Sequence, residues 1–206
     1  MKIKSFYIFL AMLALAACGS PGSVEEPQAN QQQSFPTLAA PSGTVVKNDA
    51  SNLVLSHPEF NWTVALPDNW IITYDAGFQI NANNPDETIF MRLQAQRWAQ
   101  ESDRLPDARA YVEHWKNFTY GNIFPLFADG IQVSEVEISQ DKFGGPYLQY
   151  DFDDSAKKIH YLQVYASAGG PGSAMVTTWT TYDEYDKAQK TMQTIIDSFE
   201  LLENAQ

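Results

Sequence analysis

The chain has 206 residues, a formal net charge of -12, three histidines and a single cysteine, so it cannot contain an internal disulfide framework. Hydrophobic residues make up 44% of the chain and aromatic residues 13%, which is enough for a folded core and argues against general disorder. The acidic balance excludes nucleic acid as an expected partner, because binding to phosphates relies on Lys and Arg.

The N-terminal residues have the layout of a secretory signal. Lys2 and Lys4 form a short basic region, and residues 6–17 form an apolar stretch that is too short for a bilayer, which needs about 20 apolar residues. At its end, Leu15-Ala16-Ala17-Cys18 resembles the lipobox of bacterial lipoproteins. In that family the chain is cut just before the cysteine, which is acylated on its thiol and its new amino group. The resemblance therefore implies lipidation of Cys18; the alternative is an ordinary signal peptide with a chance cysteine.

Three segments follow from this interpretation. We expect a lipoprotein signal peptide at residues 1–17, an acylated cysteine with a disordered tether at residues 18–50, and a globular domain at residues 51–206. The tether is rich in Pro, Gln and Ser, and such a segment buries too little apolar surface to offset its ordering entropy. The lipid anchor would hold the domain outside the cytoplasm, on the cell membrane or the outer membrane. Gly19 resembles the outer-membrane sorting pattern of enterobacterial lipoproteins, whereas a single-membrane organism would place the protein on the outer face of its only membrane.

The globular segment alternates between strand and turn patterns. Apolar residues occupy every second position from Phe60 to Leu66, as in a half-buried strand. Further strands are predicted at residues 70–72, 77–82, 88–96, 131–138, 146–152, 158–166 and 174–181. One amphipathic helix is predicted to open at Pro106, and a second begins at Thr181 with a capping box to Glu184. The pattern predicts a largely antiparallel sheet on which each helix packs one face.

Two short motifs bracket this segment. The first predicted strand ends in the turn Pro67-Asp68-Asn69-Trp70, and the last helix ends Ile196-Asp197-Ser198-Phe199. With the order of elements between them, about residues 53–202 resemble the PsbP-like superfamily, which includes the DcrB-type bacterial lipoproteins. The resemblance implies an α+β fold, a three-layer α/β/α sandwich around a largely antiparallel sheet. It also implies an accessory or binding protein rather than a catalyst, but no functional residue of the family matches closely enough to be transferred.

Residues that carry catalysis are not grouped in any recognisable motif. His57, His114 and His160 are far apart in the sequence, and there is no second cysteine, so the sequence predicts neither a metal site nor a cofactor. No nucleophile elbow is present either, and we expect the protein not to be an enzyme. Asp151 and Asp153 share one strand face and could offer oxygens to calcium, but the lysines that follow favour an exposed hairpin end.

The connection after the first helix is unusually apolar. Phe124, Leu126 and Phe127 lie between Gly121 and Gly130, in a stretch that is neither a regular helix nor a good strand. Such residues either pack over the edge of the sheet or form a patch that contacts a partner. The sequence does not show whether Trp98 and Trp179 lie in the core or on the surface.

The sequence thus predicts a membrane-anchored, extracytoplasmic lipoprotein that acts as a non-catalytic binding or accessory module. Its partner would be a protein assembly in the cell envelope, with Phe124, Leu126 and Phe127 as candidate contacts. The alternative is a small ligand or a cation bound in a cleft of the sheet domain, since the acidic charge favours cationic ligands.

Overall fold

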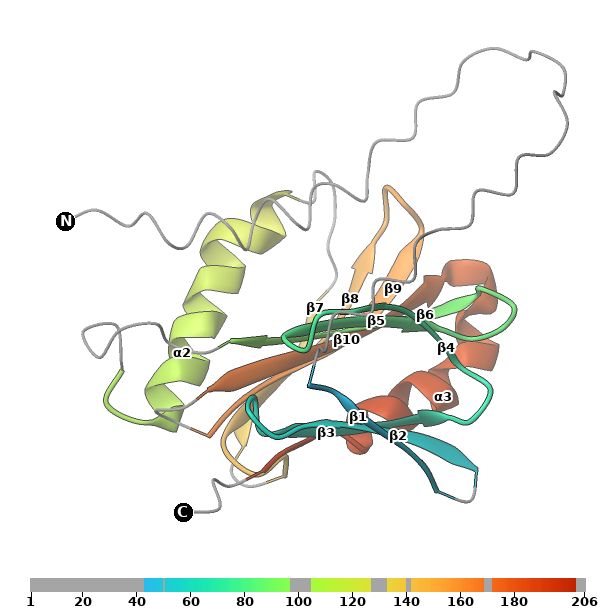
Figure 1. Ribbon diagram of the computed structural model, residues 1–206. Coiled ribbons are helices and arrows are strands. Elements are labelled where there is room, and N and C mark those ends of the chain that lie inside the picture. The colour runs from blue at the N-terminus through green and yellow to red at the C-terminus, as the bar shows by residue number, and fades with distance from the viewer. Residues whose placement is uncertain are drawn as a thin grey trace, which may run out of the picture. The chain divides into compact units, whose positions relative to one another are not determined.

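The computed structural model describes residues 43–49, 51–96, 105–126, 133–139, 142–168 and 172–202. The predicted signal peptide, Cys18, Trp98 and Phe127 lie outside these ranges. The described part contains two antiparallel sheets and two longer helices (Figure 1). The strands are β1 (Val45–Asp49), β2 (Asn52–His57), β3 (Trp62–Pro67), β4 (Ile71–Asp75), β5 (Gln79–Asn83), β6 (Ile89–Gln96), β7 (Val133–Ser139), β8 (Tyr147–Asp154), β9 (Ile159–Ser167), β10 (Ser173–Thr181) and β11 (Glu200–Leu201). The helices are α2 (Ala108–Phe118) and α3 (Tyr185–Asp197), with short helical turns at Thr119–Ile123, Phe124–Leu126 and Tyr182–Glu184.

The larger sheet has seven strands in the order β4-β5-β6-β10-β9-β8-β7. Its centre is β10, which pairs antiparallel with β6 on one side and with β9 on the other. Val176 of β10 lies opposite Leu93 of β6 and Val164 of β9, and all three side chains are fully buried. Because alternate residues of a strand point to opposite faces, this register defines a first, apolar face of the sheet.

The smaller sheet has the order β1-β2-β3-β11 and was not predicted as a separate sheet. Its β3 is the predicted alternating strand, with Trp62, Val64 and Leu66 fully buried. Strand β1 (Val45–Asp49) pairs with β2 although it precedes residue 51, where the globular domain was predicted to begin. All five residues of β1 are exposed, so the strand lacks the apolar alternation that would have revealed it.

The two helices are capped differently from the prediction. Helix α2 begins after Asp107, whose carboxylate accepts a hydrogen bond of 2.8 Å from the Ala110 N–H, so Pro106 lies just outside it. The capping box predicted for α3 is absent: Thr181 makes no side-chain cap and α3 begins only at Tyr185. Glu184 instead lies 3.1 Å from Lys187 on the exposed surface.

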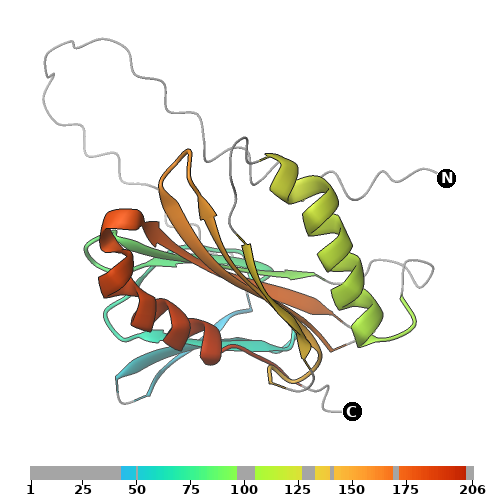
Figure 2. The same ribbon diagram turned by 180° about the vertical axis from the view of Figure 1, so that it is seen from behind.

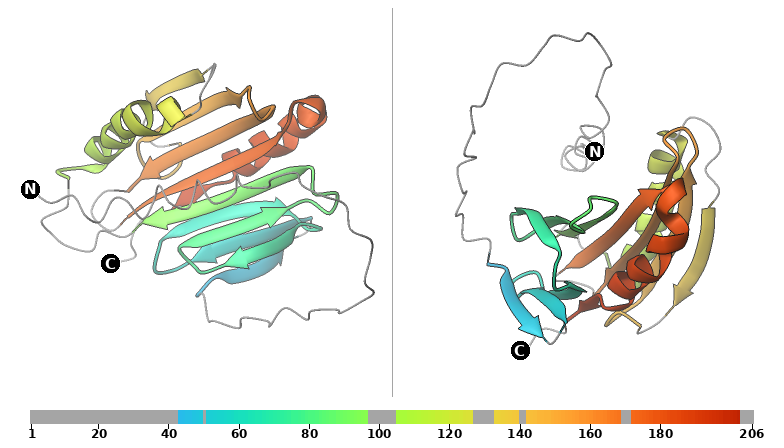
Figure 3. Two further views of the ribbon diagram at one scale, coloured as in Figure 1. Left: turned by 90° about the horizontal axis from the view of Figure 1, so that it is seen from above. Right: turned by 90° about the vertical axis from the view of Figure 1, so that its right-hand side faces the viewer.

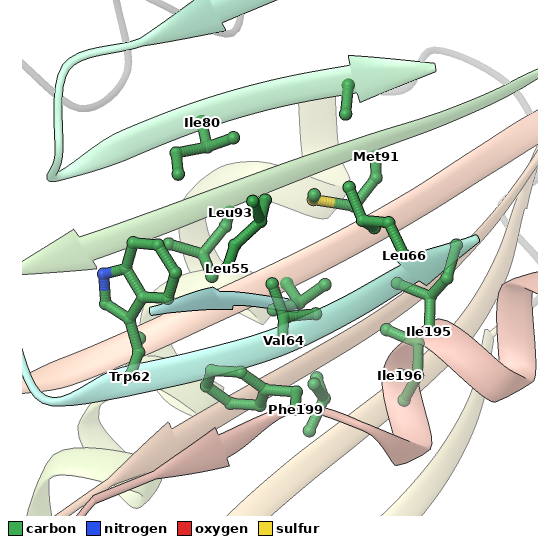
Figure 4. Close-up of a cluster of buried hydrophobic side chains, with 14 of the residues drawn as sticks. Leu55, Trp62, Val64, Leu66, Ile80, Met91, Leu93, Ile195, Ile196 and Phe199 are labelled. Atoms are coloured by element: carbon green, nitrogen blue, oxygen red, sulfur yellow. The ribbon is translucent and has the colours of Figure 1, made fainter. Parts of the chain in front are cut away.

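The main core lies between the first face of the seven-stranded sheet, helix α3 and the smaller sheet. Figure 4 shows Leu66 and Val64 of β3 among Met91 and Leu93 of β6, with Ile195 of α3 beside them. The end of α3 is fastened to β3 by Ser198, whose hydroxyl accepts a hydrogen bond of 2.9 Å from the Ala65 N–H and lies 2.7 Å from Ile195 O. The Ser-Phe motif therefore joins α3 to the smaller sheet.

Helix α2 packs on the second face of the seven-stranded sheet. It contacts β7, β8 and β9, and the Trp115 ring stacks on Tyr165 with the ring centroids 4.9 Å apart. Figures 1 and 2 show α2 and α3 well separated, with strands of the sheet between them. The three-layer α/β/α arrangement is thus confirmed, with the smaller sheet added to the α3 layer. None of the helices in the described part of the chain is long and apolar enough to cross a bilayer.

Candidate functional site

Helix α2 covers only part of the second face of the seven-stranded sheet. Helix α2 contacts β7 to β9 and makes no comparable contact with β4, β5, β6 or β10. In the left view of Figure 3, α2 lies at the β7 and β8 side, and no other coloured helix lies in front of β4, β5 and β6. This part of the face, carried by β4, β5, β6, β10 and the Tyr161 end of β9, is called the open face below, although its Gln79, Gln94 and Met175 are at most 9% exposed.

Aromatic side chains cross the open face in one transverse row. Trp179 of β10 pairs in register with Phe90 of β6 and with Tyr161 of β9, and Tyr161 pairs with Phe152 of β8. The Phe90 and Trp179 rings stack with centroids 5.5 Å apart, and the Phe152 and Tyr161 rings with centroids 4.8 Å apart. The Tyr161 and Trp179 rings lie 6.4 Å apart at an angle of 32°, so the four rings form one continuous row. Burial raises the pKa of the Tyr161 hydroxyl to about 12, so this residue stays neutral at physiological pH.

A second transverse row holds one positive charge among amides. Arg92 of β6 lies opposite Asn81 of β5 and Thr177 of β10. Its Nε donates a hydrogen bond of 3.1 Å to Asn81 Oδ1, and its guanidinium carbon lies 5.8 Å from the centroid of the Trp179 ring. Burial lowers the pKa of Arg92, although it stays charged, because an arginine pKa is far above neutral.

The third row consists of buried polar side chains. Gln94 of β6 lies opposite Gln79 of β5 and Met175 of β10. Gln94 as a whole is only 6% exposed. Its amide oxygen is buried and has no hydrogen-bond partner among the described residues. Buried amide groups are nearly always hydrogen-bonded, so the Gln94 oxygen is an unsatisfied acceptor that lies below the accessible surface.

The loop residues predicted from the sequence lie at the far end of α2, beside β8. The Phe124 ring is half-buried and packs against Tyr150 and Phe152, each with ring centroids 5.4 Å apart. Leu126 is 63% exposed and Tyr120 43% exposed. Phe124 therefore fixes the segment to the sheet, the Tyr120 ring packs edge-on against Phe124 and Tyr150, and Leu126 is the most exposed of the three.

His160 stands between two carboxylates on the first face of the sheet. Its Nδ1 lies 2.7 Å from Asp153 Oδ1, and its Nε2 lies 2.9 Å from Asp151 Oδ1, although the second contact is poorly aligned for a hydrogen bond. The Tyr185 ring of α3 packs against the imidazole, with centroids 3.7 Å apart. The two aspartates share a face, as predicted, but they flank a ring instead of converging on one point. Within the described ranges, no group of three or more His, Cys, Asp or Glu side chains is arranged to hold a metal ion.

We expect this cluster to make stability depend on pH. Burial lowers the pKa of His160, but the contacts with Asp151 and Asp153 raise it by more, so the net shift is upward from 6.5. A raised histidine pKa stabilises the fold below the unfolded value and loses that effect as pH rises through the folded value. The melting temperature should therefore fall between about pH 6 and pH 8, and His160→Gln should flatten this slope.

His114, an exposed histidine of α2, provides the matched control for that measurement. His114→Gln should leave the pH slope unchanged, because α2 lies on the opposite face of the sheet from the cluster of His160, Asp151 and Asp153. A wild-type slope that survives in His160→Gln would assign the pH dependence to other groups.

The whole fold is similar to a known structure. The solution structure of cyanobacterial PsbP (CyanoP) from Synechocystis sp. PCC 6803 superposes with a TM-score of 0.52 and 13% identity, covering 75% of this chain and 94% of that chain. The fold is PsbP-like. This confirms the predicted α+β class and the fold that the two sequence motifs implied.

A second match to the PsbP-like domain is weaker. A crystal structure from Bacteroides thetaiotaomicron VPI-5482 superposes with a TM-score of 0.42 and 14% identity, covering 72% of this chain and 48% of that chain. No protein-family model matches the sequence, and no curated protein is significantly similar to it.

The open face of the PsbP-like domain was not predicted from the sequence. Each strand taken alone does show polar or aromatic residues at alternate positions that share one face. These are Gln79, Asn81 and Asn83 in β5, and Phe90, Arg92 and Gln94 in β6. A solvent-facing strand surface usually carries charges, whereas this one carries amides, aromatic rings and one arginine. Only the register of β6, β10 and β9 brings these separate segments into common rows.

Proposed function

We propose that this protein is a lipoprotein anchored through Cys18, located outside the cytoplasm, that acts as a non-catalytic accessory module of a protein assembly in the cell envelope. The lipobox-like sequence at residues 15–18 supports the anchor, and the tether-like composition up to residue 42 would separate the domain from the membrane. The PsbP-like fold supports a binding rather than a catalytic domain, consistent with the resemblance of the sequence.

The observation that carries this proposal is the apolar segment after α2. Among the large hydrophobic residues that the structure describes, Leu126 is the most exposed, at 63%. Tyr120 in the same segment is also exposed. Phe124 holds the segment against Tyr150 and Phe152. An apolar surface held in one conformation loses little entropy when a partner binds, so this segment suits a protein contact.

Crosslinking in cells tests the proposal. A photo-crosslinking amino acid in place of Leu126 should give an adduct with one envelope protein in the full-length chain, and the same amino acid in place of Tyr182 should not. Tyr182 is the matched control because it is also exposed, at 37%, but precedes α3 on the other layer. The adduct should disappear in Cys18→Ser. Equal adducts from both positions, or only abundant envelope proteins, would contradict the proposal.

A second candidate function is the binding of a small ligand on the open face. The observation that favours it is Arg92, a half-buried cation on this face that no carboxylate among the described residues pairs with. The ligand on this face would not be the cation that the overall acidity suggested, because the charge next to Gln94 is that of Arg92.

A further inference from the structure

We propose that one edge of the domain rests on the lipid surface to which Cys18 would anchor the chain. The contact is an apolar patch, called the entry patch below, that consists of Val45, Val46, Tyr74 and Phe78. This inference rests on the lipid anchor of the proposed function and adds to it the orientation of the domain on the membrane. It is independent of the protein partner, which is proposed to bind elsewhere, beside α2.

The entry patch gathers exposed apolar side chains from neighbouring segments. Val45 and Val46 belong to β1, Tyr74 belongs to β4, and Phe78 lies in the connection between β4 and β5. Each of these residues is between 40% and 48% exposed. Single exposed hydrophobic residues are common on protein surfaces, whereas a group of them on one edge indicates an interaction site.

The carboxylate of Asp75 joins the two strands that carry the patch. Asp75 Oδ1 accepts a hydrogen bond of 2.9 Å from the Thr44 hydroxyl and another of 2.9 Å from the Gly77 N–H. Three of the four patch residues are direct sequence neighbours of these bonded residues. The hydrogen bonds therefore hold the patch residues of β1 and of the β4 hairpin next to one another.

The entry patch lies at the edge of the domain where the chain enters it. Strands β1 and β4 are edge strands of the two sheets, and the right view of Figure 3 shows β1 (blue) and β7 (gold) on opposite sides of the domain. The described part begins at Gly43. About 25 residues separate Gly43 from Cys18, and a random coil of that length spans about 25 to 30 Å. Of the described domain, this edge is therefore the part that the anchor would hold nearest to the membrane.

The charge at this edge also suits a lipid surface. The charged side chains of β1, β4 and the turn after β4 are Lys47, Asp49 and Asp75, and Asp75 is already hydrogen-bonded. A lysine can lay its stem along apolar surface and place its ammonium group among lipid head groups, and a tyrosine ring suits the boundary between apolar and polar layers. The rest of the domain is acidic, so we expect the patch to prefer zwitterionic lipids over anionic ones.

The two edge strands are not suited to pairing with another chain. Lys47 occupies the centre of β1, and β4 has a bulge between Ile72 and Tyr74, where its register with β5 shifts. A central lysine and a bulge both prevent an edge strand from adding a further strand. A second copy of the chain would also bring its own net charge of -12. The side chains of the patch, and not its backbone, are therefore the groups that make the contact.

Fluorescence on vesicles tests this orientation with the full-length, acylated protein. Cys18 is the only cysteine and would carry the lipid, so a polarity-sensitive fluorophore reacts only with an introduced cysteine. The two labelled variants are Thr73→Cys, at an exposed position of β4, and Thr194→Cys, at an exposed position of α3. Each is inserted through its lipid into phosphatidylcholine vesicles that contain a head-group quencher. We expect blue-shifted, quenched emission from Thr73→Cys and unchanged emission from Thr194→Cys.

Two further variants assign the contact to the patch. Tyr74→Ser combined with Phe78→Ser should remove the quenching and the blue shift at Thr73→Cys, because these side chains supply the aromatic surface. Tyr182→Ser is the matched control, since it removes an exposed tyrosine outside the patch, and it should leave both signals as they are in the wild type. Anionic phosphatidylglycerol in the vesicles should weaken the signals.

The possible failures are distinguishable. Equal emission from Thr73→Cys and Thr194→Cys in the acylated protein would overturn the orientation and leave the anchor intact, and crosslinks from Phe78 to an envelope protein would then assign the patch to a protein contact. Mass spectrometry of the mature protein reports on the anchor itself, and a chain without lipid on Cys18 would overturn the proposed function and this inference together. A signal that survives the double substitution would overturn the patch as the contact. The comparison of the two labelled positions needs no patch variant, so it decides the orientation even if the double substitution fails to fold.

Discussion

Replacing Gly144 with alanine should lower the free energy of unfolding by about 4 kcal/mol or more, the largest effect that we expect from a single methyl group in this chain. Gly144 has a φ of +77°, in the left-handed region that favours glycine. A Cβ at this position would collide with the Leu201 carbonyl oxygen of β11. That backbone cannot move freely, because the Leu201 N–H donates a 3.0 Å hydrogen bond to Phe143 O. Denaturant unfolding should show a clearly lower midpoint with little change in slope.

Gly121 supplies the control for this substitution. It lies in the π-helical turn after α2, and a Cβ there would meet nothing within 4 Å. Gly121→Ala should therefore leave the stability unchanged or raise it by about 0.4 to 1 kcal/mol, because it removes backbone freedom from the unfolded chain. Equal unfolding midpoints for the two variants would show that the β11 backbone yields easily at Gly144.

The Gly144-Gly145 turn also shows what the sequence can and cannot tell. The glycine pair predicted a turn before β8, and that turn is present. The sequence did not show that β11 passes against it, because β11 is a strand of two residues, Glu200–Leu201, that comes more than 50 positions after Gly144. Short strands of this kind form only because a neighbouring backbone is already in place, so they carry little signal of their own.

The larger elements could be predicted where one face is buried and the other is not. Trp62, Val64 and Leu66 of β3 and Ala188, Met192 and Ile195 of α3 follow their periods closely. Strand β1 could not be recognised, because all of its residues are exposed. The buried residues of strand β2 are Leu55 and His57. Because histidine is polar, its burial could not be predicted from an apolar pattern.

The open face is harder to predict for a different reason. Phe90, Tyr161 and Trp179 come from three strands that are far apart in the sequence, and only the pairing of β10 with β6 and β9 aligns them. Gln94 and Arg92 look like ordinary polar positions until the neighbours opposite them are known. Their significance lies in what is missing, a partner for the Gln94 oxygen and a carboxylate for Arg92 among the described residues.

Trp62→Ala should be the second most damaging change, with a loss of about 3 to 5 kcal/mol. The side chain is fully buried and pairs with His57 of β2 on one side and with Leu201 of β11 on the other. Figure 4 places it at the edge of the cluster that joins β3 to the large sheet. Removing it would leave a cavity between the two sheets, which the rigid strands on either side cannot close. Thermal and denaturant unfolding would both report the loss.

The conservative variant makes this prediction sharper. The indole nitrogen of Trp62 is buried and has no hydrogen-bond partner among the described residues, so Trp62→Phe removes an unsatisfied donor together with part of the ring. We expect Trp62→Phe to cost only about 1 to 2 kcal/mol, well below Trp62→Ala. Tyr74→Ala, at an exposed position of β4, should change stability by less than about 0.5 kcal/mol. If Trp62→Phe were as harmful as Trp62→Ala, the indole nitrogen would have to make a contact that stabilises the junction, and the cavity explanation would be wrong.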